Sequence, residues 1–150
     1  LQGILGKYFS QEQGFDNEIS IAISDHYLPT GLNSTLPKKP ISCTIAIADK
    51  IDNLVGFFGL NEKPTSSKDP YALRRAAIGL LKIIIENRLI VQLKDLINYS
   101  IILYEEQGVK FLNDSTLDEI MSFLKLSKSF ADGFKCVITC HIGFFLSHKW

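Results

Sequence analysis

Apolar residues recur at intervals of three or four along much of the chain, which is the spacing of one face of an α-helix. The longest such segment runs from residue 41 to residue 59, and its main stripe comprises Ile47, Ile51, Leu54 and Phe58. A neighbouring stripe places two carboxylates on one face, in the series Ile45, Asp49, Asp52 and Gly56. We therefore predict a helix over 41–59 with one buried side.

Two more helices are predicted on either side of this segment. Asp16 or Asn17 can cap the first, which should stop before Pro29. Asp69 followed by Pro70 is typical of a helix start, with a capping residue and then proline at the first helical position. The positions on the predicted buried faces are Ile19, Ala22, Ile23, His26 and Tyr27 in the first helix, and Leu73, Ala76, Ala77, Leu80, Leu81 and Ile84 in the second.

The second half of the chain continues the helical period. Gly108 closes a helix over 91–106, and Thr116 with Glu119 forms a capping box ahead of the next helix. The predicted buried positions are Leu93, Leu96, Ile97, Ile101 and Tyr104, and then Leu117, Ile120, Met121 and Leu124. Residues 29–40 are predicted to be an ordered loop, and no stretch alternates long enough to require a sheet. The fold class is therefore all-α.

Composition further predicts that the protein is soluble and belongs to a reducing compartment. The 150 residues are 46% hydrophobic, enough for one compact domain or a small domain and the start of another. Cys43, Cys136 and Cys140 cannot all pair within the chain, no secretory signal is visible, and the longest apolar run, 137–146, is too short for a membrane span. Because the sequence opens on Leu1 and not on Met, we interpret it as a fragment.

Charge is balanced overall but uneven along the chain. Sixteen basic residues match sixteen acidic ones, yet residues 63–88 hold six lysines and arginines against two acidic residues. Lys63 and Lys68 flank hydroxyl side chains just before a helix start, and Arg74 and Arg75 follow, so an RNA phosphate could bind there. The alternative is that Asp69 only caps its helix and that one arginine pairs with an internal carboxylate.

Four segments resemble the β subunit of the two-subunit bacterial glycyl-tRNA synthetase. The most specific are residues 48–59, ADKIDNLVGFFG, and residues 63–77, KPTSSKDPYALRRAA. Residues 1–6, LQGILG, and residues 26–29, HYLP, follow the same order and approximate spacing. The resemblance covers roughly residues 1–125.

This resemblance implies a non-catalytic fragment that binds glycine tRNA and helps to assemble an α2β2 enzyme in the cytoplasm. Glycine would be activated with ATP and Mg²⁺ on the α subunit, so no cofactor, membrane or DNA is expected to bind this fragment. The implied architecture is an HD-domain-like helical bundle over 1–88, then the beginning of a helical, anticodon-binding-like domain over 89–125. Residues 126–150 depart from the family and are interpreted as a divergent tail, possibly frameshifted.

An HD-type phosphohydrolase is the alternative function. Such enzymes bind metal through a histidine, a His-Asp pair and a distant aspartate, and His26 and Asp49 could be remnants of that set. The dipeptide here is Asp25-His26, however, and the chain has no His-Asp pair. A structural pairing of Asp49 or Asp52 with Lys50, His26 or an arginine is the competing interpretation. A zinc site at Cys136, Cys140 and His141 has only weak support, because no fourth ligand is evident, although His148 is nearby, and the spacing matches no common structural site.

Overall fold

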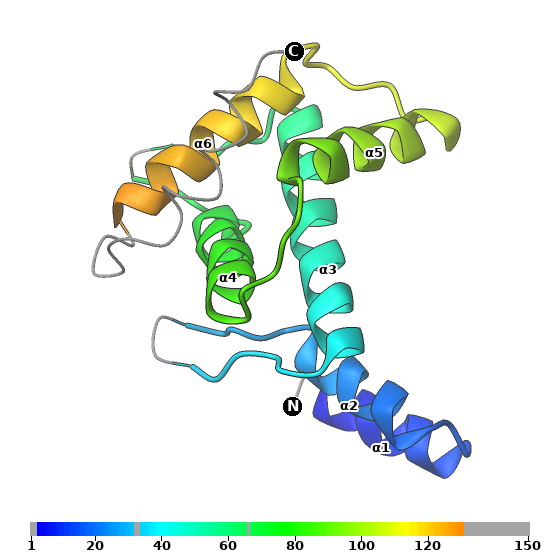
Figure 1. The fold of residues 1–150 in the computed structure, drawn as a ribbon. Helices are drawn as coiled ribbons and strands as arrows, with labels where there is room; N and C mark the ends of the chain where they lie inside the picture. The colour runs from blue at the N-terminus through cyan, green and yellow to red at the C-terminus, as the bar shows by residue number, and fades with distance from the viewer. Residues whose placement is uncertain (1–2, 32–33, 66, 131–150) are drawn as a thin grey trace, which may run out of the picture.

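Six α-helices make up the regular structure of the part of the chain that the computed structural model describes, residues 3–31, 34–65 and 67–130 (Figure 1). Within those ranges no strand occurs, so the all-α prediction is confirmed. The helices are α1 (Ile4–Glu12), α2 (Asn17–Asp25), α3 (Pro40–Gly59), α4 (Leu73–Glu86), α5 (Leu93–Glu106) and α6 (Thr116–Phe130).

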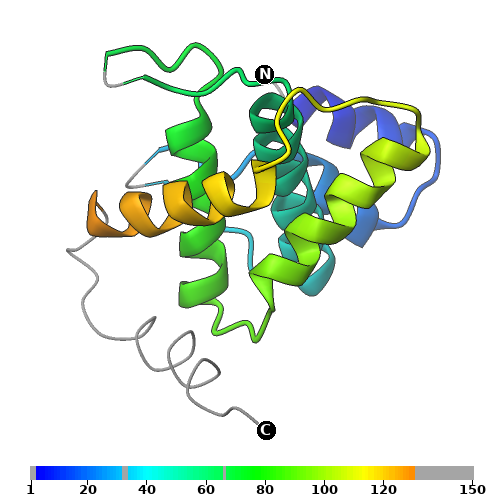
Figure 2. The same ribbon diagram turned by 90° about the horizontal axis from the view of Figure 1, so that it is seen from above.

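The long helix α3 lies at the centre, and α2, α4, α5 and α6 all pack against it (Figures 1 and 2). It begins at Pro40, where a proline loses no hydrogen bond because the first helical N–H groups have no partner within the helix. The predicted stripe is buried in full, as Ile47, Ile51, Leu54 and Phe58 all belong to the core. Periodicity therefore located this helix and its buried side.

Helix α4 starts later than the sequence suggested. The prediction of a start at Asp69-Pro70 is wrong, because Ala72 adopts a left-handed conformation with φ of 54° and separates Pro70 from the first helical residue, Leu73. Asp69 still caps the helix from a distance, since its carboxylate accepts the N–H groups of Leu73 at 2.8 Å and Arg74 at 3.0 Å. Four of its six predicted core positions are buried, and Ala76 and Ile84 are half-buried.

Helices α5 and α6 complete the core, and α6 packs on both α3 and α4. In α5 only Ile97 is fully buried, and in α6 the buried apolar side chains are those of Ile120 and Leu124. The predicted capping box is wrong for Thr116, which does not cap the helix. Its hydroxyl donates to the carbonyl of Asn113 at 2.6 Å, while the Glu119 carboxylate accepts a hydrogen bond from Ser115. The chain enters α6 through an Asn113–Ser115 turn, which shifts the cap by one residue.

The α1–α2 pair lies beyond one end of α3 (Figure 1). Helical periodicity did not predict α1, whose only buried side chain is Ser10. The predicted buried face of α2 is confirmed in part: Ala22 is buried and Ile23 and His26 are half-buried, whereas Ile19 and Tyr27 are exposed. Among the described helices, α2 packs mainly against α1 and α3, so part of its surface stays uncovered.

The core draws side chains from α3, α4, α5 and α6. The division at residue 88 into two domains stays a prediction. From position 131 on, the proposed tail lies outside the described residues, and so do Cys136, Cys140, His141 and His148. Cys43 is buried and forms no disulfide with any residue that the structure describes. In the described ranges no helix combines the length and apolarity that a membrane crossing requires.

Candidate nucleic-acid interface

The four predicted cations lie on the connection between α3 and α4 and on the first turn of α4. Within that connection Thr65 and Lys68 exchange backbone hydrogen bonds, of 2.8 Å from the Thr65 N–H and 3.3 Å from the Lys68 N–H. The Thr65 hydroxyl also accepts the Lys68 N–H at 3.2 Å. These bonds close a narrow turn that leaves the Lys68 side chain exposed to solvent.

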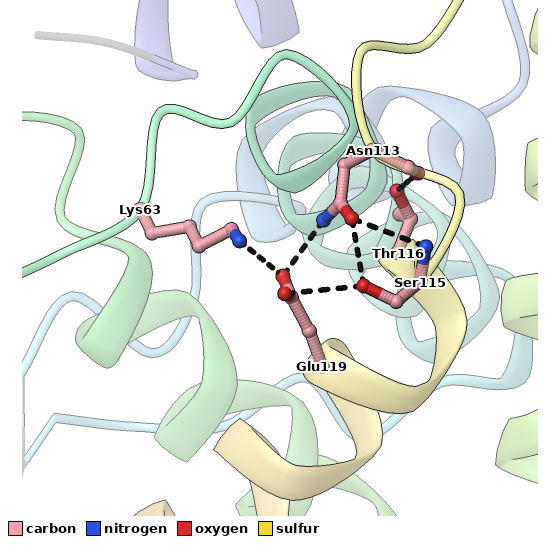
Figure 3. Close-up of polar contacts among 5 residues, drawn as sticks. All are labelled: Lys63, Asn113, Ser115, Thr116 and Glu119. Carbon is pink, nitrogen blue, oxygen red and sulfur yellow. Dashed lines mark hydrogen bonds and ion pairs between the residues drawn. The ribbon is translucent and has the colours of Figure 1, made fainter.

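Lys63 points away from this turn and forms an ion pair with Glu119 at the start of α6 (Figure 3). The same carboxylate accepts hydrogen bonds from the Asn113 amide at 2.7 Å and the Ser115 hydroxyl at 3.2 Å. The bond from Lys63 is the main reason why the pKa of Glu119 lies below its usual value, with Asn113 and Ser115 adding to the effect. Lys63 thus holds the connection against α6, and its charge is neutralised within the fold.

Arg74 is also engaged internally. Its guanidinium donates to the backbone carbonyl of Thr65 and lies 4.0 Å from the Asp69 carboxylate. Since Asp69 binds the first N–H groups of α4 as well, both parts of the alternative to phosphate binding are observed: a helix cap and an internal arginine pair. The Arg74 side chain nevertheless keeps 42% of its surface exposed.

Arg75, the next residue in the first turn of α4, is exposed to solvent. It borders a hollow of about 350 Å³ between α4 and residues 29–31, and Lys82 borders the same hollow two turns further along the helix. Lys82 belongs to the basic segment 63–88, but the sequence alone did not place it in a site. Lys82 follows Arg75 by seven residues, and this spacing already indicated that the two cations share one face of the helix.

The two predicted metal positions come near each other but serve other contacts. His26 caps the C-terminus of α2, and its Nδ1 lies 2.7 Å from the carbonyl oxygen of Ile23. The buried Lys50 donates to the His26 carbonyl at 3.0 Å and lies 3.9 Å from the Asp49 carboxylate, so the predicted pairing of Asp49 with Lys50 is observed. Burial lowers the pKa of Lys50, and Asp49 partly counteracts this.

His26 and Asp49 both border a wide, largely apolar groove of about 1120 Å³ between α2, α3 and α5. Across the described residues, no group of three or more histidine, cysteine, aspartate or glutamate side chains is arranged to hold a metal ion. A metal at His26 and Asp49 therefore stays a prediction without a third described ligand.

The Glu119 network gives a testable pH dependence. A carboxyl group with a lowered pKa in the folded state stabilises the fold fully above its unfolded pKa, near 4.3, and this contribution is lost as pH falls through the lower folded value. Because the group is one third exposed, solvent screening keeps the contribution small, about 0.5 kcal/mol. Urea unfolding should show Glu119→Gln less stable than the parent by about this amount at pH 7, and the difference should shrink as the pH falls through the folded pKa of Glu119. Glu62→Gln, at an exposed position, is the control, and a pH-independent difference would contradict the network.

Known proteins resemble this chain closely. Residues 1–131 match the family described as glycyl-tRNA synthetase beta subunit. The chain is 50% identical over 125 residues to the glycine–tRNA ligase beta subunit of Rickettsia canadensis, and 45% identical over 124 residues to that of Colwellia psychrerythraea. Each alignment covers 83% of this chain but only 18% of the relative, so the chain spans about a fifth of the length of these relatives. These similarities do not favour the phosphohydrolase alternative.

Proposed function

Because the chain belongs to the glycyl-tRNA synthetase β-subunit family, we propose that it contributes tRNA binding and α2β2 assembly to the attachment of glycine to tRNA. The proposal assigns no aminoacylation active site to these residues and leaves ATP and Mg²⁺ to the α subunit of the parent complex. It keeps the HD-like description of residues 1–88 and a cytoplasmic location. Glycine tRNA and the α subunit are the proposed partners.

The observation that carries the tRNA part is the pair of exposed cations Lys68 and Arg75. Among the described residues neither side chain makes an ion pair, whereas Lys63 and Arg74 both face carboxylates. A phosphate gains most from a cation whose charge is not already neutralised, because it then needs to displace only water and counterions. We therefore assign the strongest phosphate contacts to Lys68 and Arg75, and weaker ones to Lys63 and Arg74.

The assembly part is supported by apolar side chains that remain on the surface beside the wide groove. Ile90 is 85% exposed and Tyr99 is 61% exposed, and Leu96 and Leu103 of α5 are partly exposed next to them. Exposed apolar surface of this kind is typical of sites that bind another protein surface. Retention of the chain by an immobilised α subunit is the measurement for this part, and a lack of retention would contradict it.

The tRNA part predicts a salt-dependent loss of affinity. Replacing Lys68 and Arg75 together by alanine should weaken binding of glycine tRNA about tenfold near physiological salt. The slope of log K against log salt should become shallower by about 1.5, because two phosphate contacts no longer release counterions. Filter binding or fluorescence anisotropy across a salt series measures both quantities.

The matched control is the double substitution of Lys94 and Lys110, two exposed lysines at the start of α5 and in the connection that follows it. It removes the same formal charge away from the α3–α4 connection and should leave affinity within about twofold. Equal losses in the two double variants would mean that only net charge matters, and the proposed surface would be wrong.

A further inference from the structure

The hollow beside α4 has the form of a binding pocket for a single nucleotide unit. One wall is residues 29–31, which pass alongside α4 (Figure 1), and the other is the helix face that carries Arg75, Ile78 and Lys82. Its volume of about 350 Å³ lies at the lower end of the range for small-molecule sites, which suits a group the size of a nucleotide.

The floor of the hollow is apolar and fixed. Pro29, Ile78 and Gly79 line it, and a Cβ at Gly79 would lie 3.2 Å from the Pro29 ring and 3.1 Å from the Lys50 side chain. The loop and helix are therefore packed as closely as glycine allows at this point. Because Pro29 itself is buried, the wall should not collapse into the space above it.

Cations stand at both ends of this floor. Arg75 and Lys82 are seven residues apart, which is two turns of helix and about 10 Å along its axis. Arg74 adds a third cation at the rim, against one carboxylate, Asp69, which already accepts two backbone N–H groups. An apolar surface between two cationic ends matches a base flanked by its two phosphates.

We propose that this hollow binds one unstacked nucleotide of the RNA, with its base against Pro29 and Ile78 and its phosphates near Arg75 and Lys82. This inference rests on the proposed tRNA contact and adds to it a specific ligand group and two positions, Ile78 and Lys82. Single-stranded RNA is read through bases that leave the stack and pack on apolar or guanidinium surfaces, so the pocket selects a loop or an end over a duplex.

Gly31 allows the pocket to be closed without disturbing the core. A Cβ built on Gly31 would meet no atom within 4 Å, and the residue is exposed at the rim of the hollow. Gly31→Trp should fill the space and weaken glycine tRNA binding at least fivefold, the lower end of the effect of losing one stacked base. Gly31→Ser, at the same position, should bind within about twofold of the parent.

Lys82→Ala provides a second, independent test. It should weaken binding about threefold to tenfold and make the salt slope shallower by about one, since it removes a single phosphate contact. Competition by an unstructured RNA oligonucleotide should exceed that by an RNA duplex of equal length, and Gly31→Trp should remove the difference. Circular dichroism melts confirm that each variant is folded before binding is measured.

The outcomes separate the pocket from the proposed function. If the parent chain binds no tRNA, the function and the pocket are both wrong. If Lys68 and Arg75 substitutions weaken binding while Gly31→Trp has the affinity of Gly31→Ser, the chain binds tRNA through its surface and the pocket is wrong. Equal competition by duplex and single-stranded RNA would also overturn the pocket.

Discussion

Replacing Gly59 by alanine should lower the free energy of unfolding by about 3 kcal/mol, the upper end for overpacking a core. A Cβ built on Gly59 would lie far inside van der Waals contact with Cδ1 and Cε1 of the Phe111 ring. Gly59 is buried in the last turn of α3, where alanine alone would gain about 1 kcal/mol in helix propensity. The clash should outweigh that gain.

The ring has little freedom to move aside. Phe111 packs against Tyr104 with ring centroids 5.5 Å apart, and the next residue, Leu112, donates its N–H to the Gly59 carbonyl at 2.8 Å. This backbone bond fixes the α5–α6 connection directly over the end of α3. To relieve the clash with the new methyl group, the whole α5–α6 connection would have to shift. Such a shift would also disturb the packing of α6 on α3.

Urea unfolding of Gly59→Ala, Phe111→Ala and the double variant measures the effect as a double-mutant cycle. The double variant should be more stable than the sum of the two single losses predicts, because removing the ring also removes the clash. Gly31→Ala, where a Cβ meets nothing within 4 Å, should change stability by less than about 0.5 kcal/mol. Additive losses in the cycle would exclude a Gly59–Phe111 contact as the cause.

The sequence predicted those features of the fold that depend on neighbours in the chain. The α3 stripe from Ile47 to Phe58 is periodic over three turns, so its buried side followed directly from spacing. The start of α4 did not follow, because Asp69-Pro70 has the chemistry of a helix start while the left-handed Ala72 that delays it has no signal of its own. The exposure of Ile19 and Tyr27 also depends on how few helices cover α2, which periodicity does not report.

In the candidate site, too, the sequence predicted what depends on chain neighbours and missed what depends on tertiary packing. The basic segment was visible as a cluster of charge, and all four predicted cations do lie on one connection and the turn after it. The sequence treated them as equivalent, whereas Lys63 is paired with Glu119, 56 positions away along the chain (Figure 3). Arg74, in turn, faces Asp69. Which cations remain available to an anion is thus decided by tertiary packing.

Replacing Asp69 by alanine should lower the free energy of unfolding by about 2 kcal/mol, the upper end for a helix cap. The carboxylate accepts two N–H groups, those of Leu73 and Arg74, and lies 4.0 Å from the Arg74 guanidinium. Without it the first turn of α4 has two unsatisfied donors that are partly shielded from solvent. Because Leu73 is itself in the core, fraying of this turn would expose buried apolar surface.

Asp118 provides the matched control, since it also lies in the first turn of a helix, α6, and is exposed. Its carboxylate accepts no hydrogen bond from the described residues, so Asp118→Ala should lose only the charge–dipole part, about 0.5 kcal/mol. Asp69→Asn keeps an acceptor oxygen but loses the charge, and it should fall between Asp69→Ala and the parent. If urea unfolding gives Asp69→Ala and Asp118→Ala the same loss, water replaces the carboxylate at Leu73 and Arg74, and Asp69 does not anchor the start of α4.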